Sequence, residues 1–297
     1  MKDLENYIDY LLYQKKYSQN TAIGYKNDIL LFFMYLEKES LNYLDIEYSD
    51  IRLYFEYLDL KKLSKTSINR NISALRNFYK YLLRNKLIDN NPFNLVSAPK
   101  KDKKLPKFLY QNEIEVLFNT PSLDDVLGIR DRLILEMLYA TGIRVGEAEL
   151  IKLKDIDFKN KSIRIIGKGN KERYVYFGSF AKEYLDLYLN KSRVKLDKNN
   201  SEYLFLNKNG TRLTARGIRL ILDKVINKSS LDLDISPHTL RHSFATHMLE
   251  KGCDILSVQE LLGHESLKAT QVYTHITNDR LKEIYLNSHP RGKKQIK

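Results

Sequence analysis

A chain of 297 residues, of which 43% are hydrophobic, is long enough for one large domain or two ordinary ones with real cores. The 50 Lys and Arg residues against 37 Asp and Glu give a formal net charge of +13, which favours a polyanionic partner, nucleic acid first and an anionic membrane surface second. No hydrophobic run reaches the ~18 residues of a membrane span, and the acidic residues near the start do not fit a signal sequence.

The composition also bears on compartment and cofactors. The single cysteine, Cys253, excludes an intramolecular disulfide and fits a reducing cytosol, so we expect a cytoplasmic protein without a membrane partner. The sequence contains no Cys/His cluster at zinc spacing and no G-x-x-x-x-G-K-[ST] nucleotide loop. We therefore expect neither a metal ion nor a cofactor. A basic protein that is merely soluble is the alternative to one that binds nucleic acid.

Hydrophobic residues recur at helical spacing in four segments of the first ninety residues, which predicts a helical N-terminal domain over residues 1–97. These segments are 4–12, 23–36, 51–58 and 68–82. Lysines, arginines and tyrosines lie between the apolar positions, and such side chains suit contacts with DNA phosphates. For any one of these residues, a solvated helix face is the better interpretation.

A basic linker is predicted at residues 98–108, between the N-terminal domain and a second domain over residues 109–297. Its central stretch, PKKDKKLPK, has five lysines and a proline near each end, so it is extended and strongly positive. Such a linker can be solvated, or it can cross a DNA backbone.

The second domain begins with helical patterns, and one of them, 130–139, stops at Gly142. Arg144 follows directly, at the start of the next helix, where an arginine is well placed to hold an anion. It can equally form a structural ion pair with Glu147 or Glu149.

Two strand-like runs, 162–166 and 173–177, flank the glycine-rich turn 167–171 and predict a β-hairpin. Lys168 stands at its tip between two glycines, which let the backbone approach a partner closely. A solvated turn lysine is the alternative.

A helix begins at Ser236-Pro237, with serine as the N-cap and proline in the first turn. His238 and Arg241 lie one helical turn apart on it, near an N-terminus that favours anions. Each feature is weak when taken alone, because a His–Arg pair at one offset arises readily by chance.

A second helix over 254–262 ends at Gly263, and His264 follows in the turn. Ser266 can cap a short helix that bears Tyr273. A lone tyrosine after an apolar position is usually a core residue. Together, however, His238, Arg241, His264 and Tyr273 could converge on one anionic group.

Five segments, in one order, resemble the tyrosine recombinases, and within them the Xer-type site-specific recombinases of bacteria. They are ATGIRVGEAEL with Arg144, GKGNKER with Lys168, HTLRHSFATH with His238 and Arg241, LLGHESL with His264, and VYTHI with Tyr273. The resemblance extends over nearly the whole chain. Gly146, Glu149 and Tyr176 depart from the family pattern, but none of them is at a catalytic position.

The resemblance implies a metal- and ATP-independent strand transfer on duplex DNA. Tyr273 would attack the phosphorus and form a 3′-phosphotyrosyl link, releasing a 5′-hydroxyl. Arg144 and Arg241 would clamp the non-bridging oxygens, and His264 would add a hydrogen bond to the same phosphate. His238 is expected to act as base for the tyrosine or as a further phosphate donor, and Lys168 to protonate the departing 5′-oxygen.

The fold that this resemblance implies is mainly α. It has an N-terminal helical bundle, a SAM-like core-binding domain, and a mostly helical catalytic domain with a small antiparallel sheet. The two domains would clamp the duplex. The working unit would be a tetramer on two DNA sites, homomeric or shared with a paralogous recombinase, with a DNA translocase as a possible activator. The apolar face of a last helix, around Leu281, Ile284 and Tyr285, would dock on a neighbouring protomer.

Three other interpretations stay open at this stage. A type IB topoisomerase uses similar chemistry but reseals the same strand, and the segment after Tyr273 argues against it. An integrase borne by a plasmid, phage or transposon is a second, although no additional arm-binding module is seen before the first helix. A non-catalytic DNA-binding protein is a third, and it predicts the loss of at least one site residue. Dimer resolution in chromosome partition and cell division is the role that we expect.

Overall fold

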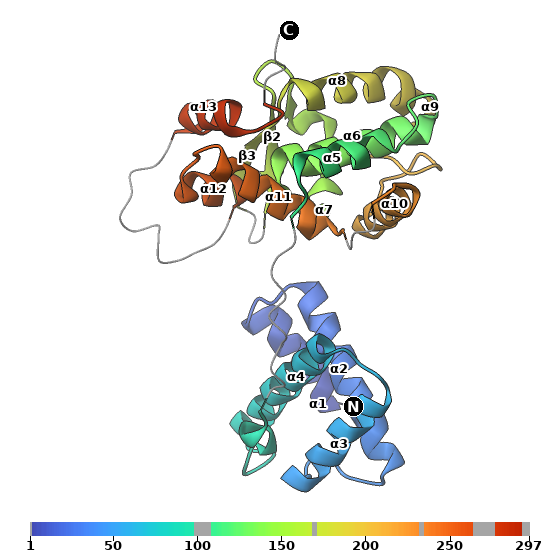
Figure 1. Ribbon diagram of the computed structural model, residues 1–297. Helices are drawn as coiled ribbons and strands as arrows, with labels where there is room; N and C mark the ends of the chain where they lie inside the picture. Colours follow the sequence, from blue (N-terminus) through green and yellow to red (C-terminus); the bar gives the residue numbers. More distant parts are fainter. Residues whose placement is uncertain (1, 98–107, 168–170, 232–234, 264–276, 293–297) are drawn as a thin grey trace. The chain divides into compact units, whose positions relative to one another are not determined.

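The computed structural model describes residues 2–97, 108–167, 171–231, 235–263 and 277–292. The chain divides into two compact units, Met1–Lys104 and Leu105–Lys297 (Figure 1). Residues 98–107 of the predicted linker lie outside the described residues. No helix in the described part of the chain is both long enough and apolar enough to cross a membrane.

The N-terminal unit is a bundle of helices, as the sequence predicts. Its elements are α1 (Lys2–Asp9), the π-helical turn Tyr10–Gln14, α2 (Gln19–Lys38), α3 (Tyr48–Leu60), α4 (Lys65–Arg84) and the 3-10 turn Pro92–Leu95. Ser18 and Ser64 cap α2 and α4 by accepting a hydrogen bond from the backbone N–H three residues later. The two helices pack together around an aromatic core that includes Phe32 and Tyr79. Aromatic rings bury a large apolar area, so this small unit has a core of its own.

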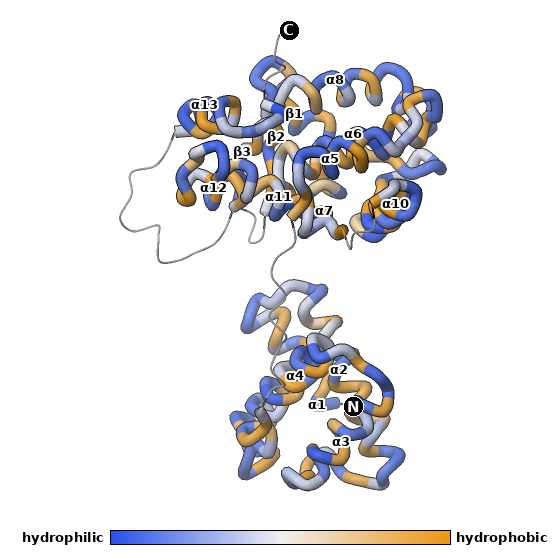
Figure 2. Tube along the Cα trace, viewed as in Figure 1, coloured by the Kyte–Doolittle hydropathy of each residue, from blue (hydrophilic) through white to orange (hydrophobic). Residues whose placement is uncertain are grey.

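The C-terminal unit is mostly helical with one small sheet. Its helices are α5 (Gln111–Asn119), α6 (Val126–Thr141), α7 (Val145–Ala148), α8 (Ser179–Leu187), α9 (Val194–Leu196), α10 (Ala215–Lys228), α11 (Pro237–Glu250), α12 (Ile255–Leu262) and α13 (Asn278–Ser288). A 3-10 turn, Leu153–Asp155, and a π-helical turn, Tyr188–Arg193, complete them. The surface helices alternate hydrophobic and hydrophilic positions (Figure 2), as amphipathic helices do.

Helix α6 is the centre of this unit. All its residues from Gly128 to Thr141 are buried, and α5, α8, α10 and α11 pack against it. It stops at Gly142, which takes the left-handed conformation with φ 61° that glycine adopts without steric cost. The sequence predicts that the helix ends here. The turn at Gly142 places Arg144 at the start of α7.

The sheet has the order β1-β2-β3 and is antiparallel throughout, with β1 (Ile156–Asp157), β2 (Ser162–Ile166) and β3 (Glu172–Tyr176). The predicted hairpin is present between β2 and β3, and its tip, 168–170, lies outside the described residues. Ile163 pairs with Val175 and Ile165 with Arg173, so these four residues share one face of the sheet. The mainly helical fold with a small antiparallel sheet confirms the predicted fold class.

Helix α13 packs on its own chain, against α11, α12 and β3. Leu281 and Tyr285 are buried there, and the residues that follow the helix dock on the same unit. Arg291 donates two hydrogen bonds to the buried Glu136, at 3.0 and 2.6 Å. A methyl group added at Gly178 would overlap the backbone of Arg291 and Gly292, so only glycine permits this close approach.

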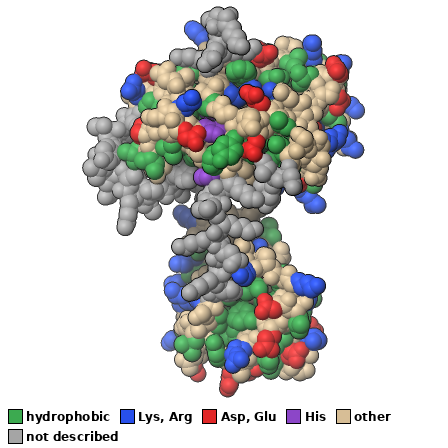
Figure 3. All heavy atoms as spheres, in the orientation of Figure 1, with side chains coloured by type: hydrophobic (Ala, Val, Ile, Leu, Met, Phe, Trp, Pro, Cys, Tyr) green, Lys and Arg blue, Asp and Glu red, His purple; other side chains and the backbone are tan. Residues whose placement is uncertain are grey.

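Acidic and basic side chains are mixed on the face of the C-terminal unit that Figure 3 draws. The net positive charge is therefore not gathered into one patch on that face.

A buried histidine makes stability depend on pH. The His289 ring stacks on Tyr285 and contacts Tyr139 and Phe244, and burial lowers its pKa to about 3. In the unfolded chain the His289 ring takes up a proton below about pH 6.5, whereas in the folded chain it does so only near pH 3. The stability that comes from the neutral ring is thus complete above about pH 6.5 and is lost as the pH falls.

We expect His289→Phe, which keeps an aromatic ring there, to flatten the pH dependence of the unfolding free energy between pH 7.5 and pH 5. The wild type should lose up to about 1.4 kcal/mol per pH unit more than the variant over this range. Urea unfolding at a series of pH values measures both slopes. Equal slopes would mean that folding does not lower the pKa of His289.

Candidate active site

Arg144 is the N-cap residue of α7, directly after the left-handed turn at Gly142. Its Nη1 donates to Glu147 Oε1 at 3.0 Å, and its backbone N–H donates to Glu147 Oε2 at 2.8 Å. The ion pair with Glu147 that the sequence left open is therefore present. It occupies one end of the guanidinium only, and the Arg144 side chain is 47% exposed. An anion can thus reach the remaining N–H groups of Arg144. The ion pair with Glu147 and the binding of an anion are therefore compatible.

Arg241 lies in the first turns of α11, which Ser236 caps and Pro237 opens as the sequence predicts. Unlike Arg144, it is buried. Its Nη1 donates to the carbonyl oxygen of Gly142, and its Nη2 donates to that of Leu262 at 2.7 Å. Arg241 therefore joins the end of α6 to the end of α12.

Burial and neighbouring positive charges lower the pKa of the Arg241 guanidinium. Burial, followed by the positive charge of Arg144, lowers the pKa of Arg241 to about 10. It still carries its charge at neutral pH. Arg144, Arg173 and Arg241 interact with a single carboxylate, that of Glu147, so positive charge is in excess among these groups. Such an excess favours an anion.

His238 shares α11 with Arg241, one turn closer to the helix N-terminus, and its side chain is exposed. The spacing predicts one face for both residues. The structure agrees on the helix and the turn, but it buries the arginine and leaves the histidine at the surface. An exposed His238 is free to meet a substrate, which a buried one is not.

Lys168, His264 and Tyr273 lie outside the described residues. The residues that precede two of them are described. Gly167 closes the hairpin with a 2.8 Å hydrogen bond from its N–H to the Lys171 carbonyl. Gly263 ends α12 in the left-handed conformation with φ 62°, as the sequence predicts.

Both of these glycines lie beside the same ion pair, Arg173 with Glu147. A methyl group added at Gly167 would lie 3.6 Å from Arg173 Nη1 and 4.0 Å from Glu147 Oε1. One added at Gly263 would lie 2.9 Å from Arg173 Nε. The chain thus enters the segments of Lys168 and His264 from points next to the group that holds Arg144.

Arg173 is the residue that sequence reasoning missed. It donates Nη1 to Glu147 Oε1 and Nη2 to Glu147 Oε2, both at 2.9 Å. The signal was in the alternation of β3, because Arg173 is in phase with Val175 and Phe177, which are buried. A charged residue at an inward position of a strand is unusual and marks a specific partner.

Tyr285, the other tyrosine of the C-terminal segment, is 1% exposed, and burial raises the pKa of its hydroxyl. A phosphorus atom of duplex DNA cannot reach it while α13 stays packed. In the described part of the chain, no group of three or more His, Cys, Asp or Glu side chains is arranged to hold a metal ion.

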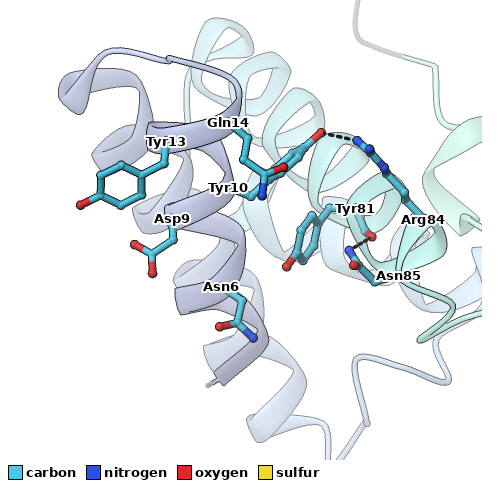
Figure 4. A pocket seen from close by; sticks show the side chains of 8 residues that line it. All are labelled: Asn6, Asp9, Tyr10, Tyr13, Gln14, Tyr81, Arg84 and Asn85. Carbon is cyan, nitrogen blue, oxygen red and sulfur yellow. Dashed lines mark hydrogen bonds between the residues drawn. The ribbon is translucent and has the colours of Figure 1, made fainter.

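A separate hollow of about 390 Å³ lies in the N-terminal unit (Figure 4). Tyr10, Tyr81 and Arg84 are among its lining, and Arg84 Nη1 donates to the Tyr10 hydroxyl at 3.2 Å. None of the predicted site residues lines it. The hollow is therefore not the place of the predicted chemistry.

The comparisons with known proteins identify the family. Residues 107–280 match the model of the phage integrase family, and residues 4–86 match that of the phage integrase N-terminal SAM-like domain. The chain belongs to the phage integrase family of tyrosine recombinases.

Relatives of similar length support the family membership. The chain is 49% identical to tyrosine recombinase XerC of Anoxybacillus flavithermus, over 97% of this chain and 98% of the relative. It is 44% identical to XerC of Bacillus subtilis, over 99% of this chain and all of the relative. Among solved structures, a post-cleavage complex of the XerH site-specific recombinase with its difH substrate has a TM-score of 0.70 and 28% identity, over 94% of this chain and 82% of that one.

The protein is accordingly an enzyme, a site-specific DNA recombinase that acts through a phosphotyrosyl intermediate. This confirms the predicted reaction class and sets aside a purely DNA-binding protein.

Substitution of Arg241 by lysine should separate charge from geometry. Lysine keeps the charge but loses the planar fork that reaches the carbonyls of Gly142 and Leu262 at once. We expect Arg241→Lys to slow single-turnover DNA cleavage by ~10²-fold or more, as the loss of a transition-state donor does. Half-site affinity, measured by gel shift, should change little. Wild-type cleavage by Arg241→Lys would assign Arg241 a structural role alone.

Proposed function

We propose that this recombinase resolves dimers of circular chromosomes or plasmids by exchanging strands between two copies of a duplex DNA site. Similarity to XerC proteins over nearly the full length of both chains supports this role. The alternative role, integration of a mobile element, differs in the DNA site and not in the chemistry. Footprinting of the purified protein on a plasmid library of its own genome would decide between them. A protected site at one chromosomal locus supports dimer resolution, and protection only at the ends of a mobile element contradicts it.

The proposed active site consists of Arg144, Lys168, His238, Arg241, His264 and Tyr273. One observation carries this proposal: Arg144 and the residues that lead into Lys168 and His264 adjoin the Arg173–Glu147 ion pair, and Arg241 donates to the carbonyl of Leu262, directly before Gly263. Segments that are more than a hundred residues apart in the chain thus meet in one region. Side chains that must act on one phosphate require such a meeting.

The reaction follows from these groups. Tyr273 attacks the scissile phosphorus, its oxygen forms the bond to phosphorus, and the bond to the 5′-oxygen breaks. The bond energy is kept in the 3′-phosphotyrosine, so the reverse attack by a 5′-hydroxyl reseals DNA without a nucleotide cofactor. Arg144 and Arg241 neutralise the charge that develops on the non-bridging oxygens, and His264 donates to the same phosphate. His238 accepts the tyrosine proton or binds the phosphate, and Lys168 protonates the 5′-oxygen.

The proposed division of labour has residues 1–97 as a helical DNA-binding domain, 98–108 as a basic linker and 109–297 as the catalytic domain. Together they would clamp the duplex. Strand exchange between two sites requires four protomers, either identical or shared with a paralogue, and a DNA translocase is a candidate activator. The buried face of α13, with Leu281 and Tyr285, would dock on a neighbour by occupying there the place that it occupies here on its own chain.

The nucleophile can be tested directly. We expect Tyr273→Phe to bind site DNA normally and to form no covalent adduct with a nicked suicide substrate, because the attacking oxygen is absent. Denaturing gel electrophoresis of radiolabelled DNA detects the adduct. Tyr285→Phe is the matched control and should form the adduct, since Tyr285 is buried. An adduct with Tyr273→Phe would remove this assignment.

The proton donor can be tested by changing the leaving group. An alkoxide leaves poorly unless it is protonated, whereas a thiolate leaves readily. Lys168→Ala should cleave ordinary DNA ~10²- to 10⁴-fold more slowly than the wild type. A substrate with sulfur in place of the bridging 5′-oxygen should abolish most of that deficit.

Arg241→Ala serves as the comparison, because its role on the non-bridging oxygens predicts no rescue by sulfur. If Lys168→Ala is equally slow on both substrates, Lys168 positions the DNA and the acid is another residue, with His238 the first to be examined.

A further inference from the structure

Arg173 is a charged residue of β3 whose side chain reaches the Glu147 carboxylate beside Arg144. It lies on the buried face of the sheet, opposite Ile165 and in phase with Val175, and its side chain is only 14% exposed. Charged side chains are rarely placed on a buried face. Its two Nη atoms bind both oxygens of Glu147, and its Nε is buried without an acceptor among the described residues. A buried ion pair is a weak source of stability, and an unpaired donor costs free energy. Stability alone therefore does not account for this arginine.

The carboxylate of Glu147 is the key to its role. It accepts four N–H groups, two from Arg173 and two from Arg144, one of the latter from the backbone. Burial would raise the pKa of Glu147, but these hydrogen bonds and the two positive charges hold it below its ordinary value, so the carboxylate is ionised. Its side chain is only 8% exposed, so solvent screens this charge little and the arginines are its main partners.

The two arginines share this carboxylate unequally. Arg173 forms the bidentate, fork-to-fork pair, whereas the guanidinium of Arg144 makes a single contact through Nη1. The bidentate arrangement is the stronger and the more neutralising of the two. Without Arg173, the nearest guanidinium with which Glu147 can form such a pair is that of Arg144. The positive charge and the N–H groups of Arg144 would then be turned away from the phosphate.

We propose that Arg173 is a positioning residue for DNA cleavage, which occupies Glu147 in a bidentate ion pair and so keeps the Arg144 guanidinium available to the scissile phosphate. The inference rests on the proposed role of Arg144. Arg173 also adjoins Gly167 and Gly263, the residues that precede Lys168 and His264.

The proposal makes a specific prediction about pairs of substitutions. Arg173→Gln should slow single-turnover cleavage of a nicked suicide substrate at least ~10-fold, towards the ~10²- to 10³-fold cost of losing a transition-state donor. The double variant Glu147→Gln with Arg173→Gln should cleave at least ~5-fold faster than Arg173→Gln, because an uncharged glutamine no longer captures Arg144. A double variant as slow as the single one, or slower, overturns the proposal, since a purely structural pair gives that result.

A second cycle tests whether Arg173 acts through Arg144. In an Arg144→Ala background, Arg173→Gln should change the cleavage rate less than ~2-fold, because the group that it positions is gone. A further loss as large as that in the wild-type background means that Arg173 acts elsewhere. Arg144→Ala alone tests the proposed function: a wild-type rate there refutes the role of Arg144 itself. A slow Arg144→Ala with a wild-type Arg173→Gln overturns only the present inference.

Arg164→Gln is the matched control. Arg164 lies in the same hairpin, on the opposite face of the sheet, and pairs with Asp155 and Glu172. Its loss should leave cleavage unchanged, and thermal unfolding of all variants reports on folding. If Arg173→Gln does not fold, Arg173→Lys replaces it, with a charge but no fork. We expect Arg173→Lys to cleave at a rate between wild type and the ~10-fold loss, and a wild-type rate would show that the bidentate contact is not needed.

Discussion

The carboxylate of Glu147 is the interaction on which the arrangement of the catalytic unit depends. It is a buried negative charge among Arg144, Arg173 and Arg241, and without it these cations would repel one another in a region of low dielectric. One carboxylate against three guanidinium groups leaves an excess of positive charge, which a phosphate can neutralise. In the proposed active site, the phosphate of the substrate would neutralise this excess.

The scaffold that holds this group is α6 and the turns attached to it. Because α6 is buried along almost its whole length, its C-terminal end is fixed by packing on several sides. The left-handed turn at Gly142 then directs the chain into Arg144, and the carbonyl of the same glycine accepts a hydrogen bond from Arg241. The two arginines are therefore positioned from one point of the backbone. Such rigid support is what a transition-state donor needs, since reorganisation at the moment of reaction would cost rate.

Much of this could be predicted from the sequence, because local signals and local structure coincide. The stops at Gly142 and Gly263, the start at Ser236-Pro237 and the hairpin around residues 167–171 depend on residues within a few positions of one another. The burial of Arg241 and the partner of Arg173 could not be predicted in this way. Arg241 donates to carbonyls at the ends of two other helices, and Arg173 is held by a glutamate 26 residues earlier in the chain. The apolar face of α13 predicted that something would cover it, but no local pattern could identify its own chain as the cover.

The close approach at Gly178 has a consequence for how the last residues behave. Its backbone touches that of Arg291 and Gly292 so closely that one additional carbon atom has no space. The tail, Arg291 and Gly292, can therefore dock here only because residue 178 is a glycine, with a hydrogen atom where other residues have a side chain. An alanine at this position would displace Arg291 and Gly292, and with them the hydrogen bonds from Arg291 to the buried Glu136. A side chain at this position would therefore act as a steric wedge between the tail and its own chain, with no charge in the substituted residue itself.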